Sequence, residues 1–358
     1  MAYYRLPEKE LRAYCEAVMG KYGFNEKQSR DIADILLTAD LQGLESHGVQ
    51  RLIRYHRGVK SGVIRPDAVP EVVHETPLSV VLDAHSAMGQ IAAVDAMERA
   101  IAKAKQYGFG AAVVRNSNHF GVGGYYAMMA EREDMLGMCF TNTQAICVPT
   151  FGREVMLGTN PIAFAMPADP IPMLYDVATT VVPRGKLEVY AKQGKPMPLG
   201  WAVDENGKDT SDAKRVIDNI NSKAGGGILP LGGSSPATGS HKGYGLALIV
   251  EILSSIIAGG ATSNHGARTA SATHRRASSR SITACSATRP RCARAFRRFC
   301  RSCATAPRPR AAPAFTPPAR WRSTPAMKSS KTASPSTTPR SRSFAPSAAS
   351  LGSTLTRW

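Results

Sequence analysis

One boundary in the sequence limits what this chain can fold into. Residues 263–358 hold 19 Lys and Arg and no Asp or Glu, and they consist mostly of Ala, Ser, Arg, Thr and Pro. Because this stretch lacks hydrophobic periodicity, it has no means of building a packed core of its own. The formal net charge of +18 comes from it, since residues 1–262 hold 26 basic and 27 acidic residues. We therefore expect a nearly neutral folded body and a disordered basic tail.

Three interpretations of the basic tail compete. It could be an arm that binds polyanions, or a metal module in which Cys300 and Cys303 have ligand spacing, with other cysteines and a histidine nearby. Metal is the weakest, because one Cys-x-x-Cys without a second pair is a poor zinc signal. We favour a frame shift near residues 258–270, because GC-rich codons read out of register give this composition. One permitted codon choice for residues 326–331, read two bases later, encodes Asp-Glu-Val-Phe-Glu.

The body carries no sign of secretion or of a membrane. Its three cysteines, Cys15, Cys139 and Cys147, lack the spacing of a disulfide framework and favour a reduced, cytoplasmic protein. The N-terminus does not resemble a secretion signal, and no apolar run reaches the length that spans a bilayer. We therefore expect no membrane partner.

Apolar periodicity predicts a helical N-terminal layer. Pro7 can occupy the first turn of one helix, and Asn25 with Gln28 resembles a capping pair for a second. A third helix is predicted from Ser46 to about Ser61, with Ser46 as its N-cap.

Beyond the N-terminal layer, short apolar strands alternate with helices, which predicts an α/β fold. The predicted strands are 79–83, 111–114 and 136–141, and the predicted helices are 90–107, the segment after Gly124, and 241–258. Residues 181–227 are rich in Gly, Pro and charge and predict loops and hairpins around Trp201. The predicted domains are 1–75, helical; 76–262, an incomplete cofactor- and substrate-binding α/β domain; and 263–358, the tail.

Two polar clusters suggest a reaction site. His119 lies in a glycine-containing turn after the strand 111–114, where α/β proteins place ligand-handling groups, although a lone loop histidine is more often structural. His47 and Arg51 are four residues apart, so in a helix they share one face near its positive end. Arginine can bind a carboxylate by two hydrogen bonds, and histidine can change its charge near neutral pH. The alternative is a capped helix with two exposed polar residues.

The sequence lacks the common nucleotide-binding fingerprints. No Gly-x-Gly-x-x-Gly motif is present, which argues against a Rossmann fold, and no Walker lysine loop exists. Residues 158–161, 176–180 and 239–245 are weaker candidates. The last of these combines glycines with Lys242 before a predicted helix, which suits a phosphate.

Taken together, these segments resemble the malate/L-lactate dehydrogenase family of NAD(P)-dependent oxidoreductases, whose members include ureidoglycolate dehydrogenase and diketogulonate reductase. The resemblance covers about residues 3–262, in the motifs SHGVQR at 46–51, RNSNHFG at 115–121, GTNPIAF at 158–164, DVATT at 176–180, GWAVD at 200–204, LPLGG at 229–233 and HKGYGLAL at 241–248. It implies a non-Rossmann α/β fold and a homodimer. It also implies hydride transfer between the nicotinamide of NAD or NADP and C2 of a small 2-hydroxy or 2-oxo acid of the malate or lactate type.

The resemblance also implies roles for individual residues. His47 and His119 are the candidates for proton donor or acceptor, with His119 preferred, and Arg51 is the candidate for the substrate carboxylate. Ser46 and Thr143 are expected in the same pocket. The cofactor-binding residues that it implies are Asn160, Asp176, Ala178, Thr179, His241, Lys242 and Gly243. None of these roles needs a metal.

One departure from the family matters. Relatives continue after the helix 241–258 with ordered chain, including an acidic segment that closes over the cofactor, whereas here the match stops near Gly260. We therefore expect this chain to be poorly folded or inactive, because stability margins are small. The alternative function is a non-catalytic polyanion-binding protein that uses the tail, without a specific nucleic-acid partner. Salt-dependent nucleic-acid binding that vanishes on truncation at residue 262 would favour it.

Overall fold

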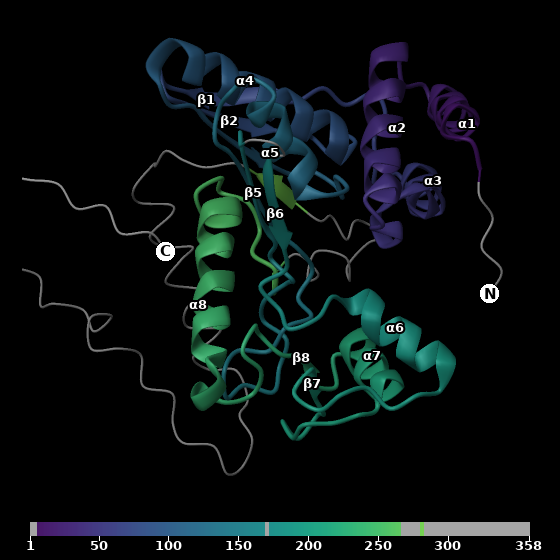
Figure 1. Ribbon diagram of the computed structural model, residues 1–358, viewed down its shortest axis with the longest axis vertical. Helices are drawn as coiled ribbons and strands as arrows, with labels where there is room; N and C mark the ends of the chain where they lie inside the picture. The colour runs from purple at the N-terminus through teal and green to yellow at the C-terminus, as the bar shows by residue number, and fades with distance from the viewer. Residues whose placement is uncertain (1–5, 169–171, 266–279, 283–358) are drawn as a thin grey trace, which may run out of the picture. The chain divides into compact units, whose positions relative to one another are not determined.

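The computed structural model describes residues 6–168, 172–265 and 280–282 (Figure 1). The chain divides into two units, Met1–Phe315 and Thr316–Trp358, and all the described residues belong to the first. The prediction of a disordered tail over 263–358 is wrong for residues 263–265 and 280–282, because Ser263 is buried and Arg280–Ile282 form a strand paired with residues 140–142. The rest of the tail, with its cysteine pair and the segment 326–331, lies outside the described residues. None of the described helices is long and apolar enough to cross a membrane.

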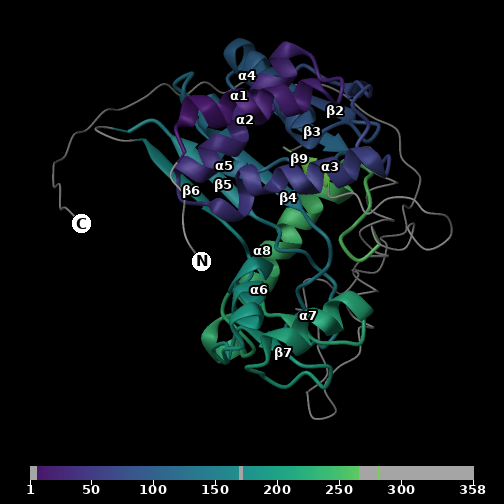
Figure 2. The same ribbon diagram turned by 90° about the vertical axis from the view of Figure 1, so that its right-hand side faces the viewer.

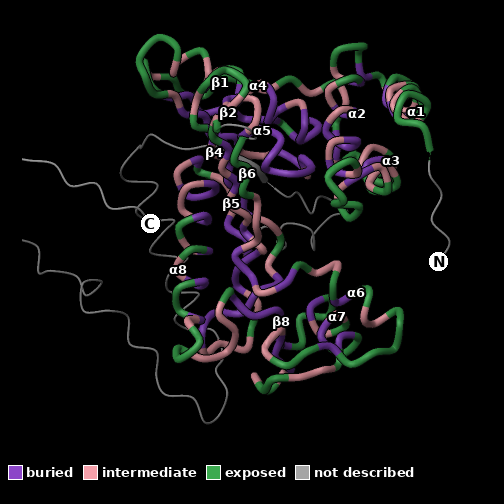
Figure 3. Tube along the Cα trace, in the orientation of Figure 1, coloured by how far each residue is buried: buried purple, intermediate pink, exposed green. Residues whose placement is uncertain are grey.

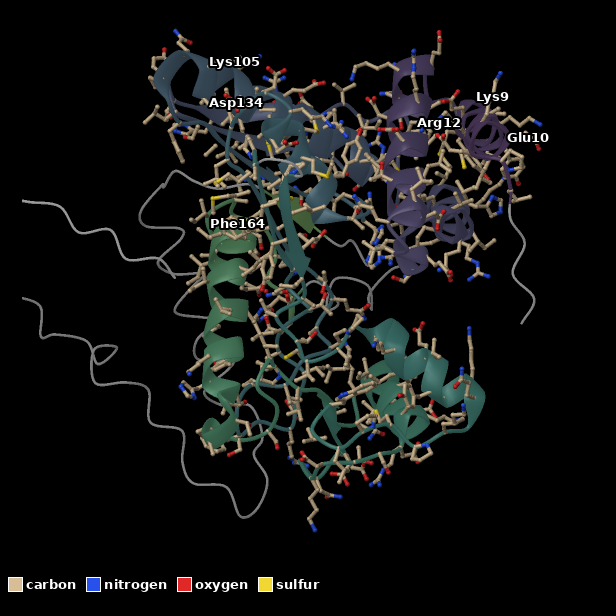
Figure 4. The ribbon with its side chains drawn as sticks, viewed as in Figure 1. Lys9, Glu10, Arg12, Lys105, Asp134 and Phe164 are labelled. Carbon is tan, nitrogen blue, oxygen red and sulfur yellow. The ribbon has the colours of Figure 1, made fainter. Side chains whose placement is uncertain are left out.

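The first two predicted helices are confirmed as α1 (Glu8–Gly20) and α2 (Glu26–Leu41). The predicted capping pair is present, because Gln28 N donates to Asn25 Oδ1 at 2.9 Å and Asn25 N donates to Gln28 Oε1 at 3.0 Å. Arg12 joins the two helices through an ion pair with Asp34 at 3.1 Å (Figure 4). The core that they share with the next helix contains Met19, Phe24, Ile32, Leu36 and Tyr55.

The third predicted helix is wrong in its first part. Residues before Leu52 form two short 3-10 turns, η1 (Glu45–His47) and η2 (Val49–Arg51), and the α-helix α3 runs only from Leu52 to Lys60. Ser46 is therefore not the N-cap of an α-helix.

Gly48 interrupts this helix because its backbone is extended, with φ −84° and ψ −152°. The Asp40 carboxylate accepts a hydrogen bond from Val49 N at 2.8 Å, and a Cβ added at Gly48 would lie 1.8 Å from Asp40 Oδ1. Only glycine allows this approach. His47 and Arg51 consequently lie on two separate turns and do not share a face of one α-helix.

The first sheet has three strands in the order β1 (Glu71–Glu75), β2 (Ser79–Asp83) and β3 (Ala111–Arg115). The pair β1–β2 is antiparallel and the pair β2–β3 is parallel, joined by the helix α4 (Gly89–Tyr107). The apolar β2 is buried throughout, whereas β1 is exposed (Figure 3). The exposed β1 carries no apolar alternation, and the sequence analysis missed it.

The second sheet has the order β6 (Met173–Val177), β5 (Ile162–Met166), β4 (Gly137–Asn142) and β9 (Arg280–Ile282), and its pairs are antiparallel. β4 confirms the predicted strand at 136–141, while β5 and β6 were not predicted. The helix α5 (Gly123–Glu131) follows β3, as expected, and packs on β4 and β5.

The prediction of loops and hairpins at 181–227 is wrong in part. This segment holds the helices α6 (Arg184–Gln193) and α7 (Ala213–Ser222) beside the two-stranded sheet of β7 (Ala202–Val203) and β8 (Gly227–Ile228). The glycines and prolines lie between these elements, and the apolar side chains of the two helices bury one another. That core contains Leu187, Ala213, Val216 and Ile220.

The helix α8 (Ser240–Glu251) confirms the predicted final helix and continues into a π-helical turn, Ile252–Ile256. It runs from the group of α6, α7 and β7 toward β4 and β5, as both ribbon views show (Figure 2). The predicted mixed α/β, non-Rossmann architecture with a helical N-terminal layer is therefore present.

Candidate active site

His119 sits in the turn between β3 and α5, and buried polar contacts fix that turn. The Asn118 side chain is buried, and its Nδ2 donates to the backbone oxygens of Ser86 and Ala87, both at 2.9 Å. The turn is thereby anchored to the residues that follow β2. His119 itself stays partly exposed.

The structure brings the two predicted histidines together. The rings of His47 and His119 stack with centroids 5.7 Å apart and planes at 25°. Ser46 Oγ lies 2.9 Å from His47 Nδ1, and Arg51 Nε donates to the backbone oxygen of Ser46. All four residues of the predicted catalytic and carboxylate-binding set therefore belong to one neighbourhood, with Gly48 supplying the bend that places them.

Two residues of this site were missed by the sequence analysis. Tyr55 Oη lies 2.9 Å from His119 Nδ1, and Gln90 Nε2 donates to Tyr55 Oη at 2.7 Å. Gly121 N also donates to His119 Nδ1, at 3.4 Å. Because a backbone N–H can only donate, Nδ1 is the acceptor in this arrangement, and the proton of the neutral ring is on Nε2. Tyr55 lies four residues after Arg51, and this spacing could have indicated from the sequence that Tyr55 belongs to the site. The sequence around Gln90 gives no such indication.

Both histidines are held neutral near pH 7. Burial, followed by the charges of Arg51 and Arg54, lowers the pKa of His47 to about 4. Burial is also the first cause that lowers the pKa of His119 well below its usual value, and Arg54 is the first charge that adds to it. Burial raises the pKa of Tyr55 to about 12, so its hydroxyl is protonated near neutral pH when no ligand is bound.

A small cavity opens beside His119. Its volume is about 290 Å³, and its lining residues are Arg54, Tyr55, Arg57, Gly58, Ser61, Val63, Ile64, Asn118 and His119. Ligand pockets span about 300–1,000 Å³, so this cavity suits a molecule of a few carbons and not a dinucleotide. Arg51, the predicted carboxylate ligand, does not line the cavity, whereas Arg54 and Arg57 do.

The predicted cofactor residue Asp176 belongs to β6, and its carboxylate lies beside the N-terminus of α5. Its Oδ2 accepts a hydrogen bond from Gly124 N at 2.7 Å, which places the carboxylate at the positive end of the helix dipole. A Cβ added at Gly124 would lie 3.2 Å from the same oxygen, so glycine permits this close approach. Burial raises the pKa of Asp176, and the Gly124 hydrogen bond opposes that change.

Hydrogen bonds join Asn160 to Thr143 and Thr179, none of which lines the cavity beside His119. Asn160 is fully buried, and its Nδ2 donates to Glu251 Oε2 at 2.8 Å and to the Ala247 oxygen at 3.0 Å. Thr143 N donates to Asn160 Oδ1 at 3.3 Å, and Thr179 Oγ1 donates to the Asn160 oxygen at 3.1 Å. Asn160, which lies two residues before β5, is therefore tied to α8 with its side chain fully engaged, and Ala178 directly precedes Thr179 in the chain.

His241, Lys242 and Gly243 lie in the first turn of the 12-residue α8. His241 and Lys242 are exposed, whereas Gly243 is buried and a Cβ there would lie 2.2 Å from the Leu231 oxygen. No hydrogen bond or ion pair between described residues joins these side chains to the two histidines. They make a separate, cationic helix end that suits an anion such as phosphate.

A buried carboxylate cluster was also missed. Glu251, at the end of α8, is completely buried and accepts hydrogen bonds from Ser263 N and Oγ, both at 2.6 Å. Asn142 Nδ2 donates to it at 3.1 Å, in addition to Asn160. Burial raises the pKa of Glu251, and these donors oppose that change. We call Glu251, Asn142, Asn160 and Ser263 the Glu251 cluster.

Comparisons with known proteins agree with this geometry. The sequence profile of the family described as malate/L-lactate dehydrogenase matches residues 6–324. The malate dehydrogenase of Pyrococcus abyssi is 46% identical over 263 residues, which cover 74% of this chain and 71% of the relative. The L-sulfolactate dehydrogenase of Methanocaldococcus jannaschii is 40% identical over 250 residues, which cover 70% of this chain and 68% of the relative.

A solved structure agrees as well. The crystal structure of malate dehydrogenase from Entamoeba histolytica has a TM-score of 0.73 and 37% sequence identity, covering 78% of this chain and 77% of that one. Profile, relatives and structure all extend over most of the chain. The profile match includes both histidines and runs past residue 262, where the motifs had predicted the resemblance to end. The chain therefore belongs to the malate/L-lactate dehydrogenase family, as a 2-hydroxy-acid dehydrogenase of the malate/lactate type.

Proposed function

We propose that this enzyme transfers a hydride between the nicotinamide of NAD or NADP and C2 of a small 2-hydroxy or 2-oxo acid, with His119 as the proton-transferring residue. The observation that carries the proposal is a neutral histidine, protonated on Nε2, in the wall of a small cationic cavity. Such a ring can donate a hydrogen bond to the C2 oxygen of the substrate.

Tyr55 and Gln90 complete the proton transfer. As the C2 oxygen gains negative charge during reduction, the Nε2 proton of His119 moves to it, and Nδ1 receives the Tyr55 proton in the same step. The Tyr55 oxygen is left as a phenolate that the Gln90 amide stabilises, at 2.7 Å, until it regains a proton from the water that enters the cavity after the product leaves. An alkoxide is a stronger base than a phenolate, even when burial raises the pKa of Tyr55 to about 12, so the transfer runs toward the alcohol. Oxidation uses the same path in reverse.

His47, Ser46 and Arg51 orient the substrate in this proposal. Arg51 binds the C1 carboxylate, and the stacked His47 ring fixes the plane of His119. Thr143 is proposed to contact the substrate from the segment after β4, where its Oγ1 accepts a hydrogen bond from Thr159 N at 2.9 Å.

The residues present fit a dinucleotide. The N-terminus of α8 places exposed His241 and Lys242 where a helix dipole favours phosphate, and Gly243 lets that turn approach Leu231. Asp176, Ala178 and Thr179 form the neighbouring wall, which Asn160 supports from behind. When bound, the dinucleotide supplies or accepts the hydride.

Other parts of the proposal concern the whole chain. We propose the domain division 1–75, 76–262 and 263–358, a homodimer, and a cytoplasmic location that the three buried free cysteines favour. We also propose that the basic tail arises from a frame shift and impairs activity. Comparing the turnover of this chain with that of a frame-restored chain tests the impairment, and equal turnover would refute it.

The test of the main function is an assay of NADH and NADPH oxidation with oxaloacetate, pyruvate and other small 2-oxo acids, in this chain and in the frame-restored chain. We expect turnover with at least one acid, and its loss in His119→Ala while the circular dichroism spectrum is unchanged. Absence of turnover with every acid in both chains would reject the proposal. Salt-dependent nucleic-acid binding that disappears on truncation at residue 262 would instead favour the polyanion-binding alternative.

A further inference from the structure

Two neighbouring turns beside the histidine site contain residues in an unfavourable backbone conformation. His85 and Ser86, which follow β2, have φ of 47° and 69°, and Asn116, which follows β3, has φ of 55°. Residues with a Cβ rarely adopt this left-handed region, because the Cβ crowds the backbone. Such conformations persist only where surrounding contacts hold them, and they gather at functional sites. The surrounding structure must therefore hold both turns in place.

The Asp83 carboxylate is shared by the two turns. Its Oδ1 accepts a hydrogen bond from His85 N at 3.0 Å, and its Oδ2 accepts from Asn116 Nδ2 at 2.8 Å and from Arg115 Nε at 2.9 Å. Asp83 ends β2, and its register partner Arg115 ends the parallel strand β3. One buried carboxylate therefore fastens both turns at the point where the two strands end.

The Asp83 side chain is a charged acceptor near neutral pH. Burial raises the pKa of Asp83, but the hydrogen bonds from His85 N, Arg115 and Asn116 outweigh burial and hold that pKa below its usual value. Hydrogen bonds to an ionised acceptor are stronger than those between neutral groups. An asparagine at this position would instead present an amide donor to at least one of the three groups that donate to Asp83.

The restraint reaches His119 through the backbone. Ser86 N donates to the Asn116 oxygen at 2.8 Å, and Asn118 Nδ2 donates to the Ser86 oxygen at 2.9 Å, directly before His119 in the chain. Between described residues, no hydrogen bond or ion pair joins Asp83 to His119, and Asp83 does not line the cavity. Asp83 can therefore influence the reaction only by fixing the turn that carries the histidine.

We propose that Asp83 is a positioning residue for the reaction. Its carboxylate holds the double turn, which comprises residues 84–87 and 115–118, so that the His119 ring keeps the orientation in which Nδ1 meets Tyr55 Oη at 2.9 Å. The inference rests on the proposed function, because it concerns the residue that transfers the proton there. It adds a requirement that lies outside the cavity and on a different sheet end from the substrate.

The alternative role for Asp83 is stability alone, through its ion pair with Arg115 at 2.9 Å. The two roles predict different kinetics. A contribution to stability leaves the kcat of the folded protein unchanged, whereas a displaced His119 ring lowers kcat, because proton transfer requires hydrogen-bond geometry. The KM for the acid changes little in either case, because Asp83 does not line the cavity.

The first experiment compares Asp83→Asn and Asp83→Ala with Asp95→Asn in the full chain. Asp95, on α4, is a matched control, because it accepts from Arg99 Nε at 2.9 Å, the same bond that Asp83 makes with Arg115. The assay uses the 2-oxo acid that the unsubstituted chain reduces fastest, and kcat is referred to the folded fraction in thermal melts. We expect kcat to fall about tenfold or more in both Asp83 variants, with less than about a threefold change in KM. Asp95→Asn should retain its kcat.

A second variant separates catalysis from stability. Asn116→Gly removes one donor to Asp83 but relieves the strain at φ 55°, since glycine adopts this conformation freely. The control is Lys223→Gly, because Lys223 is exposed outside the site and has φ of 59°. We expect neither substitution to lower the melting temperature, whereas kcat should fall about fivefold in Asn116→Gly only, because the loosened turn no longer fixes the ring.

A third measurement does not depend on turnover. The nitrogen NMR spectrum of chains with isotope-labelled histidine reports whether Nδ1 of His119 accepts a hydrogen bond, and the resonance is assigned by its absence in His119→Ala. Tyr55→Phe removes the donor and gives the position of the free nitrogen. We expect Asp83→Asn to move the resonance in the same direction as Tyr55→Phe, and Asp95→Asn to leave it in place.

An unchanged kcat in folded Asp83→Asn, or equal kcat values in Asn116→Gly and Lys223→Gly, would overturn the inference. If the unsubstituted chain turns over no acid, the proposed function fails separately. The Nδ1 resonance then decides the inference alone, and an identical resonance in Asp83→Asn and in the unsubstituted chain would overturn it.

Discussion

The pKa values of ionisable groups are shifted both in the histidine site and in the Glu251 cluster. The two regions differ in how far the fold already occupies the hydrogen-bonding positions of those groups. Glu251 is completely buried and receives four hydrogen bonds from three residues, so its carboxylate is fully coordinated by the fold. His47 and His119 are partly exposed, and His119 lines the cavity together with Arg54 and Arg57, which form no salt bridge with any described residue. A shifted pKa is common to both regions and does not by itself mark a functional site.

The two regions differ in whether they have hydrogen-bonding atoms left to bind a ligand. Around Glu251 the donors all point at its carboxylate and hold the end of α8 to β4, Asn160 and residue 263. Around His119 one ring nitrogen accepts a hydrogen bond from Tyr55, the other carries the proton, and the residue lines the cavity. We therefore expect substitutions in the first region to change stability and those in the second to change catalysis.

The strongest test of this comparison is His119→Ala. Removing the proton-transferring ring should lower kcat about 10³-fold, or about 4 kcal/mol in activation free energy, with a change in melting temperature of only a few degrees. Steady-state assays and thermal melts measure the two effects. The control is His74→Ala on the exposed β1. A loss in His47→Ala that exceeds the loss in His119→Ala would transfer the role to His47.

The matching test of the Glu251 cluster is Glu251→Ala. Buried donors of Asn142, Asn160 and Ser263 would lose their acceptor, so the free energy of unfolding should fall by about 3 kcal/mol, measured by urea denaturation. The exposed ion pair of Glu188 with Arg184 provides a control, since Glu188→Gln should cost well under 1 kcal/mol. A fully stable Glu251→Ala protein with reduced kcat would reverse the assignment of the two regions.

Tyr55→Phe tests how the histidine site is oriented. Loss of the hydroxyl removes the donor to His119 Nδ1, so we expect kcat to fall about thirtyfold, or about 2 kcal/mol. The pKa of His119 should rise, because the bond to its neutral form is lost, and the acid limb of the pH–rate profile should move to higher pH. Tyr22→Phe is a matched control, because Tyr22 Oη contacts His56 Nδ1 outside the site. An unshifted pH profile would assign Tyr55 a purely structural role.

The smallest expected effect is the response to acid. The pKa of His47 falls to about 4 in the folded chain from about 6.5 in the unfolded chain, so the unfolded state binds more protons between these values. The free energy of unfolding should therefore decrease as the pH falls from 6.5 to 4, by about 1–2 kcal/mol for this partly exposed ring. Urea denaturation of the unsubstituted chain and of His47→Asn across this range isolates the contribution, and parallel pH curves would argue against it.

The effect of acid on the free energy of unfolding also has opposite signs in the two regions. Because burial raises the pKa of Glu251, the folded state binds its proton more readily than the unfolded state does. Glu251 therefore favours folding more at low pH and less as the pH rises through its folded value, opposite to His47.

The sequence by itself determined the family motifs, the identity of both histidines and Arg51, and the elements whose signals are local. The capping box of Asn25 and Gln28 and the apolar strand β2 are examples, since their causes lie within a few residues. The same local rules failed at Ser46, because the helix there is broken by Asp40, a residue of the preceding helix that no spacing rule connects to Gly48.

Only the tertiary structure decided how the site is assembled. Tyr55 and His119 are 64 residues apart in sequence, Gln90 and Tyr55 are 35 apart, and Asn160 and Glu251 are 91 apart. Hydrogen bonds extend over about 3 Å, so contacts of this kind depend on the path of the whole backbone and leave no periodic trace in the sequence. The cavity that Arg54 and Arg57 line arises in the same way, because it needs α3 and the turn after β3 to face each other.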